Sequence, residues 1–171
     1  MKYWKLFFLS ALVFGPVGCV SRATFVPMPF DESEYAALPQ TGTGLVRGQV
    51  FAKTLGGDIK KGAGNTVVLM PATKYGDQRY AEQIAGGKFA SQAEDSRYVK
   101  YTRAKTTDGE GRFEFTDVPP GQYYIFSSIV WETVSSNEYS RRLGLTDSQG
   151  GKVSRKIEVK NGDVTEAILS R

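Results

Sequence analysis

Histidine is absent from the 171 residues, and cysteine occurs once, at position 19. Without histidine, the chain has no side chain whose ordinary pKa suits a general base near neutral pH. Ser-His-Asp and Cys-His catalytic sites are therefore excluded, as are metal sites with histidine ligands. A single cysteine also excludes an internal disulfide and a zinc cluster of thiolates, and no serine–lysine pair has a recognisable catalytic spacing. We therefore expect a protein that is not an enzyme and holds no cofactor.

Apolar runs long enough to cross a membrane are also missing, since residues 6–14 are apolar but a spanning helix needs about 20 residues. This short run follows two lysines and precedes Gly18 and Cys19, which is typical of an export signal. The segment resembles a bacterial lipoprotein signal. The resemblance implies that residues 1–18 are removed and that Cys19 is lipidated, for example with palmitate. Val20, in place of aspartate, resembles the sorting choice for the outer membrane.

The excess of basic residues is small: 22 Lys and Arg stand against 18 Asp and Glu, and two of the lysines lie in the signal segment. Charge therefore gives no support for nucleic-acid binding, which an exported protein would rarely need. We expect a lipid-anchored protein of the bacterial envelope, facing the periplasm or the cell surface. Its expected partners are the membrane through the anchor, an envelope protein and, as an alternative, a glycan.

The most informative stretch runs from residue 106 to residue 125. Asp108-Gly109 predicts a tight turn, and Gly111 allows a bulge or a wider turn instead. Residues 112–115 alternate with period two, so both phenylalanines face one side of a strand. Pro119-Pro120-Gly121 ends that strand and turns the chain. The stretch therefore predicts half of a small antiparallel sheet.

This pattern resembles the carboxypeptidase regulatory-like domain, and the likeness extends over roughly residues 44–72 and 98–171. The resemblance implies an all-β, seven-stranded antiparallel sandwich of the transthyretin-like (prealbumin-like, Ig-like) kind. That family is a scaffold without catalytic residues of its own, so the likeness says little about function. The matching residues are Thr106, Asp108, Gly111, Phe113, Phe115, Val118, Pro119, Gly121 and Tyr123.

Three parts follow along the chain: the signal at 1–18, a lipidated and extended tether at 19–43, and the sandwich at 44–171. A partly helical insertion is expected at about 73–97 and a long loop at 133–151. Asn161-Gly162 predicts a hairpin between the last two strands. The seven expected strands lie at 45–53, 66–70, 98–106, 112–118, 122–132, 152–160 and 164–170.

The strand at 122–132 is apolar on both faces, although only one face of a two-layer sandwich meets the core. The other face must be covered by the insertion or must form an aromatic patch that binds a protein or stacks on sugar rings. The leading function is a protein-binding or assembly module, and the alternative is a carbohydrate-binding module. The candidate binding residues are Trp131, Tyr124, Phe126, Tyr75 and Tyr80.

Acidic residues around the central turn do not predict a metal site. Asp108, Glu110 and Asp117 are few, and their spacing does not match a calcium-binding loop of the EF-hand type. Asp108 is expected to accept hydrogen bonds from the main chain of its own turn.

Overall fold

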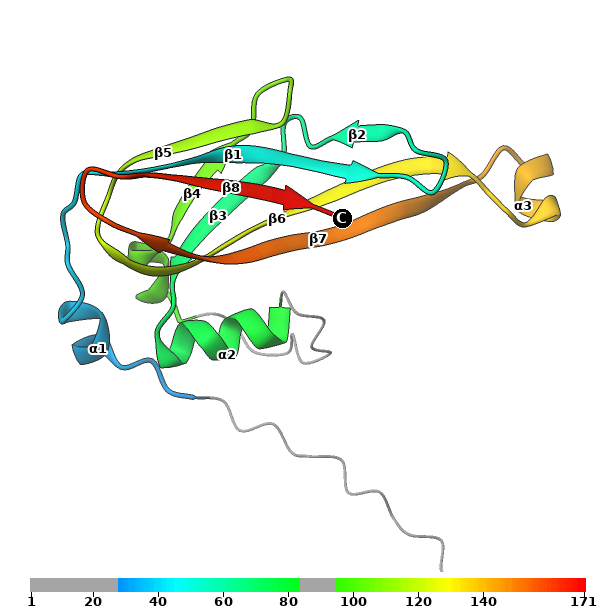
Figure 1. The fold of residues 1–171 in the computed structure, drawn as a ribbon. Helices are drawn as coiled ribbons and strands as arrows, with labels where there is room; N and C mark the ends of the chain where they lie inside the picture. The colour runs from blue at the N-terminus through cyan, green and yellow to red at the C-terminus, as the bar shows by residue number, and fades with distance from the viewer. Residues whose placement is uncertain (1–27, 84–94) are drawn as a thin grey trace, which may run out of the picture.

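The computed structural model of the chain describes residues 28–83 and 95–171. The predicted signal at 1–18 and Cys19 lie outside the described residues. Two sheets pack face to face as an all-β sandwich, which confirms the predicted fold class, with one strand more than predicted (Figure 1). The strands are β1 (Gly44–Lys53), β2 (Ile59–Lys61), β3 (Thr66–Pro71), β4 (Arg103–Thr106), β5 (Arg112–Val118), β6 (Gly121–Val134), β7 (Thr146–Val159) and β8 (Val164–Ser170).

The first sheet is built around β1, which pairs with β8 along one edge and with β5 and then β2 along the other. Alternation along β1 sends Val46 and Val50 into the core and Arg47 into solvent, as period two predicts. The core between the sheets is formed by Val46, Val50, Ala52, Val67, Leu69, Phe113, Phe115, Val118, Tyr123, Ile125, Ile129, Val153, Ile157, Val159, Ala167 and Leu169.

The second sheet has the order β4-β3-β6-β7. β6 pairs with β7 along its whole length, whereas β3 reaches only residues 123–126 of β6. Residues 127–134 of β6 therefore continue with β7 as a two-stranded ribbon, with the short helix α3 (Glu138–Arg142) at its tip (Figure 1). The predicted loop at 133–151 is too long at both ends. β6 continues to Val134 and β7 begins at Thr146, so the Ser- and Gly-rich sequence is part of the ladder.

The turn at Asn161 and Gly162 joins the two sheets and is not a hairpin. Residues 164–170 pair in parallel with residues 45–51 of β1, while β7 stays in the other sheet. Gly162 has a positive φ of 75°, and the Asn161 side-chain oxygen accepts a hydrogen bond from the Thr43 N–H at 3.1 Å. The predicted hairpin is therefore wrong, and one strand pair is parallel because the chain crosses between the layers.

Helices cover the outer face of the second sheet (Figure 1). They are α2 (Lys74–Gln83), α1 (Glu32–Ala36) and the 3₁₀ helix η1 (Tyr98–Tyr101). α2 confirms the helical part of the predicted insertion up to residue 83, and residues 84–94 of the insertion lie outside the described residues. No helix within 28–83 and 95–171 is long and apolar enough to cross a membrane. Under the helices lies a second buried cluster, here called the covered aromatic cluster: Phe30, Tyr35, Met70, Tyr75, Tyr98 and Tyr124.

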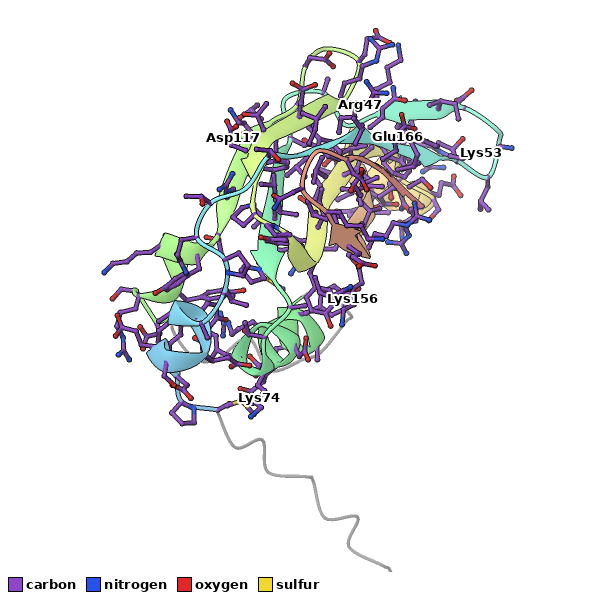
Figure 2. The ribbon with its side chains drawn as sticks, turned by 60° about the vertical axis from the view of Figure 1, so that its left-hand side comes forward. Arg47, Lys53, Lys74, Asp117, Lys156 and Glu166 are labelled. Atoms are coloured by element: carbon purple, nitrogen blue, oxygen red, sulfur yellow. The ribbon has the colours of Figure 1, made fainter. Side chains whose placement is uncertain are left out.

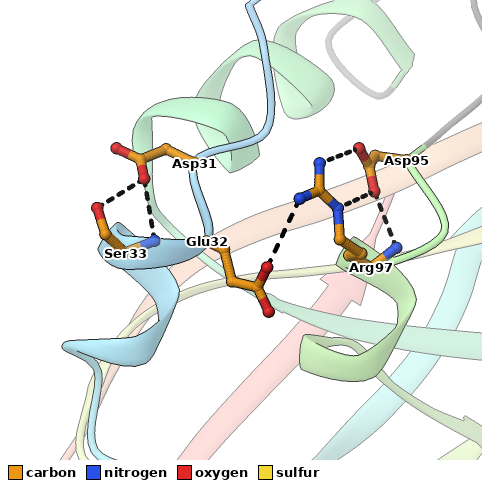
Figure 3. Close-up of polar contacts among 5 residues, drawn as sticks. All are labelled: Asp31, Glu32, Ser33, Asp95 and Arg97. Carbon is orange, nitrogen blue, oxygen red and sulfur yellow. Dashed lines mark hydrogen bonds and ion pairs between the residues drawn. The ribbon is translucent and has the colours of Figure 1, made fainter.

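The described part of the predicted tether, residues 28–43, folds onto the sandwich instead of extending from it. The Asp31 side chain caps α1, and Tyr35 on that helix has no exposed surface. Arg97 forms an ion pair with Glu32 at 3.5 Å, which ties α1 to the segment before η1 (Figure 3). The free energy gained by burying these aromatic side chains exceeds the conformational entropy lost when the segment is ordered. A helix of five residues is too short for sequence periodicity to predict it.

Tyr35 gives this packing a measurable dependence on pH. Burial raises the pKa of Tyr35 from its ordinary value of 10.0 to about 12, against a smaller lowering by its hydrogen bond with Thr73. In the unfolded chain the hydroxyl ionises near pH 10, so the free energy of unfolding should fall between pH 10 and pH 12. We expect Tyr35→Phe to reduce this fall, measured by urea unfolding at pH 9, 10 and 11. Equal slopes in both proteins would contradict the assignment.

Candidate functional site

A hollow of about 760 Å³ lies where the ends of β1 and β2 meet the β6–β7 ribbon. We call it the end hollow. Ala52 and Lys60 line it from the first sheet, and Trp131 and Gln149 line it from the ribbon. Its volume lies within the range of small-ligand sites, and its lining combines one aromatic residue with several polar groups.

Trp131 reaches the hollow because of the alternation along β6. Ile125 and Ile129 are buried in the core, and Trp131 follows on the same face, where it packs against that core while remaining partly exposed. The core therefore holds the indole in place from one side, and the hollow opens on the other. A fixed, partly exposed indole is suited to stacking on a flat apolar surface of a ligand.

Gly150 keeps β7 close to the Trp131 ring. An added Cβ at Gly150 would lie 2.0 Å from the Ile129 carbonyl oxygen and 3.0 Å from the ring of Trp131. The residue also has a φ of 111°, which side-chain-bearing residues rarely adopt. Any larger residue would therefore displace the strand or the indole.

Polar groups surround the indole. Gln149 lies directly opposite Trp131 in the ladder, so both side chains lie on one face of the ribbon. Lys60 lies opposite the buried Ala52 and shares its inward face, while Asp58 and Thr133 also line the hollow. The arrangement offers hydrogen-bond donors and acceptors around an apolar wall, as polyhydroxylated ligands require.

Glu132 borders the hollow but belongs to the opposite face of the ribbon, since it follows Trp131 directly. Its carboxylate accepts hydrogen bonds from the hydroxyls of Ser148 at 2.6 Å and Thr146 at 2.7 Å. These two bonds, Ser148 first, lower the pKa of Glu132. The two hydroxyls therefore orient this carboxylate on the other face of the ribbon from Trp131.

The five candidate binding residues do not form one platform. Tyr75 and Tyr124 are buried in the covered aromatic cluster, and Phe126 packs against it. Tyr80 on α2 stacks on Tyr124 with ring centroids 4.0 Å apart, and its hydroxyl bonds that of Ser154. Trp131 lies on the other face of β6. The outer face of β6 is thus covered at Tyr124 and Phe126, as one of the two sequence alternatives predicts, while Val130 further along that face is 60% exposed. Trp131 is the candidate that lines the hollow.

The central turn binds its own main chain. The Asp108 carboxylate accepts hydrogen bonds from the N–H groups of Glu110 and Arg112, both at 2.8 Å, which confirms the expected turn role. Gly111, with a φ of 77°, makes the wider of the two predicted turns. Within the described ranges no three acidic or sulfur ligands gather at one place.

A second hollow, of about 620 Å³, lies on the outer face of the first sheet. Half of its lining residues are charged, and two of them, Arg47 and Glu166, form an ion pair at 2.9 Å (Figure 2). No tryptophan or tyrosine lines it. Of the two hollows, the end hollow has the chemistry of a binding site. Trp131 is the one residue of its lining that the sequence pattern predicts as a binding residue. Lys60, Gln149 and Arg171 went unrecognised because only the fold brings them together.

Comparison with solved structures identifies a related protein. The crystal structure of a proposed carbohydrate-binding protein from Pseudomonas aeruginosa matches with a TM-score of 0.73 and 34% sequence identity, over 85% of this chain and 100% of the other. The chain belongs to the same protein family as that protein. No protein-family model matches the chain, and no curated protein matches it. The likeness to the carboxypeptidase regulatory-like domain therefore stays a prediction, while the sandwich fold agrees with it.

Proposed function

We propose that the chain is a non-catalytic carbohydrate-binding module and that the end hollow is its binding site. The observation that carries the proposal is the placement of Trp131, whose indole the core holds in a hollow lined with hydrogen-bonding side chains. Aromatic side chains stack on the apolar faces of sugar rings, and neighbouring polar groups bind the hydroxyls. The description of the Pseudomonas aeruginosa relative supports the same class of ligand.

The direct test is retention of the full-length chain, in mild detergent, on immobilised envelope polysaccharides and peptidoglycan. We expect Trp131→Ala to weaken retention at least about tenfold, because the stacking surface is lost. Tyr139→Ala is the matched control, since Tyr139 is 73% exposed on α3 and does not line the end hollow. Gln149→Ala is a second test that removes an exposed side chain of the hollow without opening the core.

Thermal unfolding of each variant separates a lost site from a lost fold. If Trp131→Ala and Gln149→Ala both retain normal glycan binding while Tyr139→Ala does not, the hollow is not the site. If the unchanged protein binds no glycan of the panel, the carbohydrate proposal is wrong.

We also propose that the module is a lipoprotein of the bacterial envelope, anchored through Cys19 and facing the periplasm or the cell surface. The signal-like residues 1–18 and the small residue before Cys19 support this. Metabolic labelling with a palmitate analogue should mark the protein, and Cys19→Ser should abolish the label. Persistent labelling of that variant would contradict lipidation at this position.

Protein binding, as an assembly module of the envelope, is the second candidate function. The ribbon tip favours it, because Val134, Tyr139, Leu143 and Leu145 are all more than half exposed there. Exposed apolar groups at the end of a projecting ribbon can dock into a partner. A stoichiometric protein that co-purifies with the unchanged chain, and not with a Tyr139→Ser, Leu143→Ser variant, would support this function.

A further inference from the structure

Three cationic side chains line the end hollow beside the indole: Lys53, Lys60 and Arg171. Within residues 28–83 and 95–171, none of them forms an ion pair with a carboxylate. Most surface cations simply contact solvent. These three suggest a binding role only if they lie close to Trp131.

Lys60 is directed inward by the strand ladder. It lies opposite Ala52, which is 1% exposed, so both side chains belong to the core-facing side of the first sheet. Its neighbour Lys61 lies on the outer side, where it pairs with Glu110. An inward-facing lysine at the mouth of the sandwich places a positive charge on the side of the sheet that faces Trp131.

Arg171 is fixed at the rim of the hollow by two hydrogen bonds. Its Nη1 donates to the Gly150 carbonyl oxygen at 2.6 Å, and its main-chain oxygen accepts from the Lys53 N–H at 2.9 Å. A guanidinium group carries five N–H donors, and the described contacts use one of them. The others remain for a ligand.

Negative charge in the hollow is weaker. The lining contains two carboxylates, Asp58 and Glu132, against three cations, and Glu132 keeps its charge while it accepts two hydroxyl hydrogen bonds on the other face of the ribbon. We propose that the end hollow binds an acidic saccharide, with a sugar carboxylate bound by Lys60 and Arg171 and a sugar ring stacked on Trp131. Charge-assisted hydrogen bonds from lysine and arginine are the strongest that a carboxylate can accept in such a site.

This inference rests on the proposed carbohydrate function and specifies its substrate class. The test compares an oligogalacturonate with the same oligomer after reduction of its carboxylates to hydroxymethyl groups. The full-length chain in mild detergent is titrated with both at low salt. We expect the acidic oligomer to bind at least about tenfold more tightly and to lose this advantage as salt rises.

Matched variants locate the charge. Lys60→Gln should remove most of the preference for the acidic oligomer, so that the affinities for the acidic and the reduced oligomer become similar. Lys61→Gln, on the outer side of the same strand, should keep the preference. Trp131→Ala should weaken both ligands equally, because the ring stacks whatever the charge.

The outcomes separate the two proposals. If both oligomers bind equally, or if Lys60→Gln keeps the full preference, the acidic-saccharide inference is wrong while carbohydrate binding stands. If neither oligomer binds and the wider glycan panel is also negative, the proposed function fails and the inference fails with it.

Discussion

Replacing Gly48 with alanine is expected to lower the free energy of unfolding by about 3 kcal/mol or more, because close packing leaves no room for a methyl group. An added Cβ would lie 1.8 Å from the main-chain oxygen of Ala167 in β8 and 2.7 Å from the ring of Phe113 in β5. Gly48 pairs with both of these residues in the ladder. A carbonyl oxygen inside a ladder cannot turn aside as a flexible side chain can, so β1 and β8 must separate.

Urea unfolding of the variant and of the unchanged protein measures this loss. Arg47→Ala is the matched control in the same strand, since it removes an exposed ion pair with Glu166 that is worth about 1 kcal/mol or less. If Gly48→Ala is as stable as this control, β1 and β8 do not pack closely enough at Gly48 to exclude a methyl group.

Truncating Tyr35 to alanine is expected to detach the N-terminal segment from the sandwich. The ring is fully buried, stacks on Phe30 with centroids 4.8 Å apart and bonds the Thr73 hydroxyl. Losing a buried aromatic ring of this kind costs about 3 kcal/mol or more. Because α1 has only five residues, that loss exceeds what its remaining contacts can offset.

Hydrogen exchange resolved by peptide would follow this change. Peptides that cover residues 28–43 should exchange quickly in Tyr35→Ala, while β1 and β5 keep their protection. Tyr139→Ala, which removes an exposed tyrosine, should leave both regions as they are. If the N-terminal peptides stay protected in Tyr35→Ala, α1 does not depend on this ring.

The parts of the fold that follow from local pattern could be predicted from the sequence. Alternation in residues 112–115 gives β5, and the second apolar face of residues 122–132 predicts a cover, which α2 and its neighbours provide at Tyr124 and Phe126. The ribbon could not be predicted in the same way, since Gly150 and Gly151 lie inside β7 although glycine weakens a strand. Glycine is required at these two positions because a side chain at Gly150 would meet Trp131 and one at Gly151 would meet Arg171. This steric requirement is stronger than the low strand propensity of glycine.

Long-range pairing explains the other differences. Nothing local in residues 161–164 distinguishes a hairpin from a crossing between layers, because the parallel pairing of β8 depends on a strand more than 100 residues away. The end hollow has the same origin. Trp131 is recognisable as an aromatic group on the core side of its strand, but Lys60 and Arg171 come from distant segments that only the assembled sheet brings beside it.

The lengthwise placement of β1 has a mechanical consequence. The N-terminal segment enters at Gly44, while the end hollow lies at Lys53, so the two are separated by the length of a ten-residue strand, roughly 30 Å. If the chain is anchored through Cys19 and binds a polysaccharide as proposed, a pull between anchor and ligand would load β1 along its length, against its ladders with β5 and β8. Their hydrogen bonds lie across the strands, so they would resist such a pull together rather than opening one after another.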